Sequence, residues 1–88
     1  MNRHEIAGKM QDYYQRKNEA VLTIAYSGDP DLADRLGPLI DRYERGVAHS
    51  ATQLANDPHM TLDMFFGDLL DIMAELTEDI EAIAKEVA

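Results

Sequence analysis

An unbroken heptad pattern fills the C-terminal third of the chain, and this pattern restricts the possible folds more than any other feature. From residue 61 to residue 88 the apolar residues follow one another at alternating spacings of 4 and 3. Such residues form one line along a helix, and a line of this kind packs against another helix. The pattern therefore predicts an all-α fold. The line, called the seam below, consists of Leu62, Phe66, Leu69, Met73, Leu76, Ile80, Ile83 and Val87.

The N-terminal stretch and the start of the heptad helix have readable boundaries. Apolar residues recur at helical spacing from about Arg3 to Tyr26. Gly28 is predicted to end this first helix, because glycine tolerates the left-handed conformation that follows a helix. The heptad helix starts either at Pro58 or at Leu62, since a capping residue precedes each of them. No glycine or proline follows Gly67, so we expect this helix to continue nearly to the C-terminus.

The middle stretch is helical but interrupted. Asp29-Pro30 suits a helix start, with a capping side chain followed by a proline in the first turn, and the pattern continues to about Asn56. Gly37-Pro38 lies inside it, and proline removes one helical hydrogen bond and clashes with the carbonyl four residues back. Either a short helix ends near Leu36 and a longer one starts at Pro38, or a single helix kinks there. We favour the break, which gives a small bundle of three main helices.

Composition restricts the class of protein. The 88 residues form a single domain, residues 1–88, with room for only a thin core. Cysteine is absent, which excludes disulfides, thiolate metal sites and cysteine nucleophiles. We find no secretory or membrane-spanning segment and expect a cytoplasmic protein. No histidine has a second ligand at a metal-binding spacing, and Asp29, Asp31 and Asp34 fit a helix cap better than a calcium loop. No nucleophile–base motif is present, so we predict neither a cofactor, nor a metal, nor an enzyme.

The net charge of −9 is unevenly distributed. Residues 1–26 carry +1, residues 27–60 carry −3, and residues 61–88 carry −7. Direct binding to nucleic acid or to an anionic membrane needs clustered lysine and arginine, so both are disfavoured. A basic protein surface is the partner that such a charge favours.

Acids form a stripe on the heptad helix opposite its seam. Asp68, Asp71, Glu75 and Glu78 are spaced 3, 4 and 3 apart. Acids four residues apart repel each other, at a cost of about a few tenths of a kcal/mol per pair, so the stripe is either a binding surface or a solvated helix face. Its predicted partner-binding residues are Asp68, Asp71, Glu75, Glu78, Asp79 and Glu81.

The apolar side of the heptad helix changes width along its length. Phe65, Leu70 and Ile72 broaden the first half, which should need two neighbours, and the first two helices can supply them. The second half is narrow and suits a single helix. We expect a second copy there, because two-fold dimers are the commonest oligomers. Alternatively, the first helix covers it within one chain. The predicted dimer seam is Leu69, Met73, Leu76, Ile80, Ile83 and Val87.

Two functions are compatible with these features. The first is a small acidic interaction protein, an inhibitor or mimic of phosphate charge, that occupies the basic surface of a nucleic-acid-binding protein. Phage-encoded inhibitors, anti-CRISPR proteins among them, include many small acidic chains, but this is an analogy of class and no motif is shared. The second is a structural or regulatory homodimerisation module whose acidic face is only solvated. The sequence favours the first.

Overall fold

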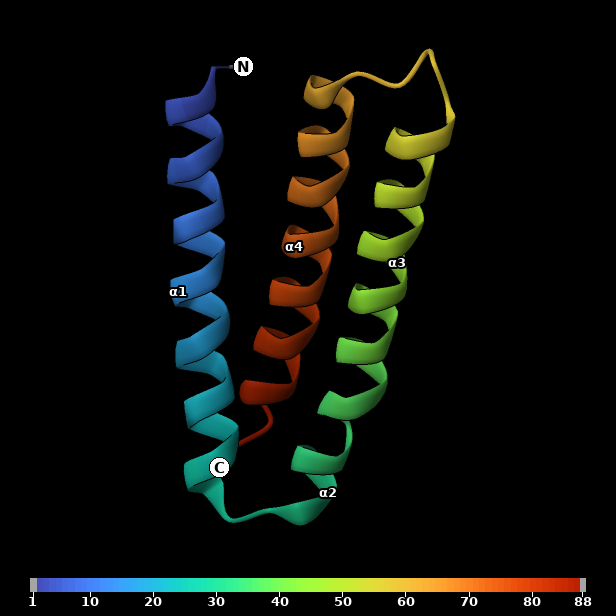
Figure 1. Cartoon of the computed structure of the whole chain (residues 1–88). Coiled ribbons are helices and arrows are strands. Elements are labelled where there is room, and N and C mark those ends of the chain that lie inside the picture. Colours follow the sequence, from blue (N-terminus) through green and yellow to red (C-terminus); the bar gives the residue numbers. More distant parts are fainter. Residues whose placement is uncertain (1, 88) are drawn as a thin grey trace.

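The computed structural model describes residues 2–87 and contains three long helices and one short helix (Figure 1). No strand occurs in this part of the chain. The all-α prediction is therefore confirmed. The helices are α1 (Arg3–Ser27), α2 (Pro30–Asp34), α3 (Leu36–Asn56) and α4 (Leu62–Ala84).

Local hydrogen bonds set the ends of α1 and α4. The Asn2 side chain accepts a hydrogen bond of 2.9 Å from the backbone N–H of Glu5 at the start of α1. At its end Gly28 adopts the left-handed conformation, with φ of 70°, as its position in the sequence predicts. Thr61 caps α4 through a bond of 3.2 Å from Met64 N–H, so the second of the two predicted starts is the observed one.

The interruption of the middle stretch lies at Arg35, slightly before the predicted position at Gly37-Pro38. Pro38 cannot donate a hydrogen bond to the carbonyl of Asp34, and its ring clashes with that carbonyl in a continuous helix. A regular helix therefore cannot continue through these residues, and the chain breaks at Arg35. Leu36 then starts α3, which places Pro38 in the first turn, where backbone N–H groups have no helical partner anyway.

The three long helices form one layer, with α4 in the middle (Figure 1). It packs along both α1 and α3, whereas α1 and α3 make at most marginal contact with each other. The Cα atoms extend over 48 × 25 × 13 Å. Three helix axes about 8–10 Å apart, with Cα cylinders about 5 Å across, span about 21–25 Å, which matches the second of these dimensions. In this layer α1 and α4 run in the same direction and α3 runs opposite to them (Figure 1).

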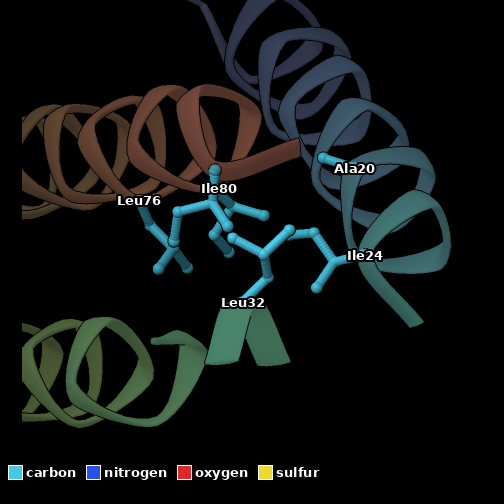
Figure 2. Packing of buried hydrophobic residues seen from close by; sticks show 6 residues of the cluster. Ala20, Ile24, Leu32, Leu76 and Ile80 are labelled. Carbon is cyan, nitrogen blue, oxygen red and sulfur yellow. The ribbon is translucent and has the colours of Figure 1, made fainter. Parts of the chain in front are cut away.

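The buried core lies at one end of the layer, where α2 is located. Leu32 points from α2 toward Ile24 of α1 and Ile80 of α4 (Figure 2). The chain must pass from α1 to α3, on opposite sides of α4, and it crosses the C-terminal end of α4 to do so (Figure 1). This connection carries Leu32 onto the seam. We call this half of the layer the closed end, and the half with the α3–α4 connection the open end.

The second half of the seam is buried more completely than the first. Its second half, predicted to need a second copy, is already buried: Ile80 is 0% exposed and Ile83 is 4% exposed. Residues of α1 and α2 pack against them, so the alternative of cover within one chain is the observed one. Its first half is flanked by α1 and α3, so the two predicted neighbours are present, but its seam residues stay half-buried and Leu62 is 53% exposed. The prediction of a dimer stays a prediction, but the second half of the seam no longer supports it.

Candidate interaction surfaces

The open end of the layer presents a continuous apolar surface, which we call the open apolar face. On α4 it begins with the exposed Leu62 and continues through half-buried seam residues, because α1 and α3 pack on the two flanks of α4 and leave the seam between them. The face consists of Met10, Tyr14 and Lys17 of α1, Tyr43, Val47 and Leu54 of α3, and Leu62, Phe66, Leu69 and Met73 of α4.

A small hollow brings residues of all three long helices together on this side of the layer. It has a volume of about 90 Å³, and its lining includes Tyr14 of α1, Tyr43 of α3 and Met73 of α4. Residues four and seven positions before Met73 lie on the same side of α4, which adds Leu69 and Phe66 to this surface.

The only charged residue of the open apolar face is held by an aromatic ring. The Lys17 ammonium lies 4.3 Å from the centre of the Tyr14 ring, within the range of a cation–π interaction. Tyr14 itself is 55% exposed. The surface position of Tyr14 becomes visible only when α1 and α3 are placed beside α4.

The opposite side of α4 carries its acids, and several of them bind arginines of neighbouring helices. The Arg16 guanidinium of α1 donates two hydrogen bonds, of 2.5 and 3.2 Å, to the Glu81 carboxylate. These bonds hold the pKa of Glu81 below its ordinary value, because the ionised carboxylate is the form that accepts them. The same pairing raises the pKa of Arg16.

A second arginine binds two acids of the stripe. Arg42 of α3 forms a salt bridge of 3.4 Å with Glu75 and a shorter one with Asp79. Asp68 lies half-buried between α3 and α4, where the Ser50 hydroxyl donates a long hydrogen bond of 3.5 Å to it. The line of charge predicted from the spacing of acids is therefore interrupted in the folded chain.

The six predicted partner-binding acids thus divide into two groups. Glu75, Asp79 and Glu81 form ion pairs. Of the remaining three, Asp71 and Glu78 are exposed and form no salt bridge within residues 2–87. The acidic surface available to a partner is consequently smaller than the sequence indicates.

The last turn of the chain is held by a third arginine. Arg35, at the break between α2 and α3, donates a hydrogen bond of 2.9 Å to Glu86. This bond lowers the pKa of Glu86 and raises that of Arg35. With this pair, four of the eight acids between residues 61 and 88 are neutralised by arginines from other parts of the fold.

The remaining concave and acidic features have structural explanations. A hollow of about 710 Å³ is an open groove at the closed end between Tyr26 and Val87. Its acids are already engaged: Asp29 caps α2 through bonds to backbone N–H groups, as predicted, and Glu86 binds Arg35. No group of three potential metal ligands occurs in the described part of the chain.

Comparison with protein-family models, with curated proteins and with solved structures found no match to this chain. Among residues 2–87, no helix combines the length and the apolar character that a membrane crossing requires. The assignment of a function therefore depends on the two surfaces described above, the open apolar face and the acidic side of α4.

Proposed function

We propose that this chain is a protein–protein interaction module that binds an apolar helical surface of another protein chain through its open apolar face. The incompletely buried first half of the seam carries this proposal. The same heptad line that is fully buried at Ile80 is half exposed at Leu62, although no change in residue type accounts for the difference.

The architecture supports a protein as the occupant. Soluble domains are built from two or more packed layers of secondary structure, because each layer has an apolar side that must leave water. Here α1, α3 and α4 form one layer, and α2 covers only the closed end. A helical surface is long and flat enough to cover the rest, and burying apolar area contributes about 25 cal/mol per Å².

Two exposed residues of α4 provide a matched test. Leu62 lies on the open apolar face and is 53% exposed, whereas Met64 lies about 200° around the helix and is 54% exposed. Since the chain has no cysteine, Leu62→Cys and Met64→Cys each introduce a single thiol. A membrane-permeant maleimide should label both variants at similar rates in dilute purified protein.

In the cells that produce the protein, we expect slow labelling of Leu62→Cys and fast labelling of Met64→Cys. The expected difference is at least about tenfold relative to the dilute protein, because a thiol in a packed interface is shielded from solvent. If the two thiols are labelled as fast in cells as in dilute solution, the open apolar face has no partner and the proposal fails.

The acidic side of α4 supports a second candidate, an inhibitor or mimic of phosphate charge that binds a basic surface. Asp71 and Glu78 favour it, because they are exposed and lie on the same side of α4 as Met64. The ion pairs of Glu75, Asp79 and Glu81 weaken it. The same labelling experiment separates the two candidates: protection of Met64→Cys alone supports the acidic surface, and protection of Leu62→Cys alone supports the open apolar face.

A further inference from the structure

We propose that the occupant of the open apolar face is a second copy of this chain, packed face to face with the two α4 helices antiparallel. This inference rests on the proposed function and names its partner. It differs from the predicted dimer, because the contact lies on the first half of the seam and not on the second half.

The surface area of the chain fits a dimer. The single chain exposes 6072 Å². A compact monomer of 9.9 kDa exposes about 5,200 Å², so this chain has an excess of about 900 Å². A standard protein interface removes about 800 Å² from each partner. Covering the open apolar face with an equal surface thus brings the exposure of each copy into the usual range.

The distribution of charge favours a contact between identical surfaces. A two-fold contact brings the same patch of both copies together, so the charges of the patch must not repel those of the same patch on the other copy. The open apolar face contains no acid, and its single lysine already lies over Tyr14. The opposite side of the layer fails this condition, because two copies meeting there place Asp71 and Glu78 against acids of the same kind.

The position of α2 determines the orientation. Leu32 contacts the seam at the closed end, so α2 lies on the same side of the layer as the open apolar face. With the two α4 helices parallel, the α2 segments of both copies meet at the same end and hold the layers apart. With the helices antiparallel, each α2 lies beyond the open end of the other copy, and the two open halves pack together.

Single cysteines test both the contact and its orientation. Leu69 lies near the middle of the part of α4 that belongs to the open apolar face, from Leu62 to Met73. The Leu69 residues of the two copies therefore lie close together in either orientation. The two Leu62 positions meet only in the parallel one. In the antiparallel dimer they are separated by roughly 20 Å, from seven residues at about 1.5 Å on each copy, which is too far for a disulfide.

Under mild oxidation we expect Leu69→Cys to form a disulfide-linked dimer, and Leu62→Cys and the control Asp71→Cys to stay unlinked. Linking of Leu62→Cys contradicts the antiparallel arrangement. Equal and slow linking of all three variants contradicts the second copy as the occupant.

Sedimentation of charge variants provides an independent measurement. Leu69→Lys places an ammonium in the contact and should weaken the dimer at least about a hundredfold, because a buried unpaired charge is costly. Met64→Lys changes the charge equally on the opposite side and should leave the dimer intact. Far-UV circular dichroism checks that both variants stay helical, and the cysteine variants decide the matter if Leu69→Lys unfolds.

The outcomes separate this inference from the proposed function. A purified chain that stays monomeric up to about 1 mM, a concentration at which even weak specific complexes form, contradicts the second copy. If Leu62→Cys is nevertheless protected in cells, the face binds a different protein and the proposed function stands. If Leu62→Cys is also unprotected there, both are wrong.

Discussion

Arg16 and Arg42 connect the flanking helices to α4 through salt bridges. They neutralise three acids of α4, which are Glu75, Asp79 and Glu81. Glu81 lies 65 positions after Arg16, and Asp79 lies 37 positions after Arg42. Within α4 alone the acids repel each other, which made them candidates for a binding surface. In the folded chain the bases of α1 and α3 supply the missing partners. The sequence shows both sets of charges, but their pairing depends on the order of helices in the layer.

The Arg16–Glu81 pair makes stability depend on pH. Its hydrogen bonds lower the pKa of Glu81 in the folded chain from an ordinary value near 4.5. A lowered pKa adds stability above the ordinary value, and this contribution is lost as the pH falls through the lowered one. Wild type should therefore resist urea better than Glu81→Gln at pH 7, and the difference should shrink as the pH falls below 4.5.

A matched variant isolates the pair in that experiment. Asp71 is exposed on the same helix and forms no salt bridge within the described residues. Asp71→Asn should therefore be at least as stable as wild type at pH 7. A stability difference between wild type and Glu81→Gln that stays constant from pH 7 to pH 3 would contradict a role of the carboxylate charge.

Two helix-interior glycines should respond differently to alanine. A Cβ on Gly67 meets no atom within 4 Å, whereas a Cβ on Gly46 lies 3.3 Å from Cδ1 of Ile72 on α4. Gly67→Ala should raise stability by about 1 kcal/mol, and raise Tm by about 4–8 °C. Gly46→Ala should raise the stability less, because the Ile72 side chain must move to make room for the new Cβ. Thermal unfolding measures both, and a larger gain at Gly46 would contradict the close approach of α3 to α4.

At the scale of the helices, the sequence predicts those helix boundaries that depend on interactions between residues close together in the chain. Gly28, Asp29 and Thr61 end or begin helices through their own backbone preferences and side-chain hydrogen bonds, and their positions were predictable. A break was also predicted, but at Gly37-Pro38 and not at Arg35. A proline excludes a regular helix through the preceding turn and does not fix the residue at which the turn opens.

Leu32 is the residue through which α2 covers the seam, and it is 8% exposed. Leu32→Ala should lower the free energy of unfolding by about 2–4 kcal/mol, as for other buried leucines. Amide hydrogen exchange of α2 should also accelerate, because Leu32 is its one buried side chain. Leu22, 52% exposed on α1, is the control, and Leu22→Ala should change stability by less than about 0.5 kcal/mol. Equal effects of the two substitutions would show that α2 does not close this end.

At the scale of the whole molecule, the chain is wider and flatter than its length requires. Its Cα radius of gyration is 14.8 Å, against about 12 Å for a compact chain of 88 residues. The heptad pattern correctly predicts a seam that needs cover. It could not predict which half receives cover, because the width of an apolar stripe says nothing about where the connection from α1 to α3 crosses. That connection passes the end of α4 and leaves the open apolar face only half-buried.

The oxidation of two methionines tests most directly whether the open apolar face is a contact between copies. Met73 belongs to this face, and Met64 lies on the opposite side of the same helix. Brief hydroxyl-radical labelling of the unmodified chain, from nanomolar to high micromolar concentration, yields both rates in one mass spectrum. We predict that Met73 becomes protected as the concentration rises while Met64 does not change. A ratio of the two rates that is constant over the whole range would contradict the proposed contact.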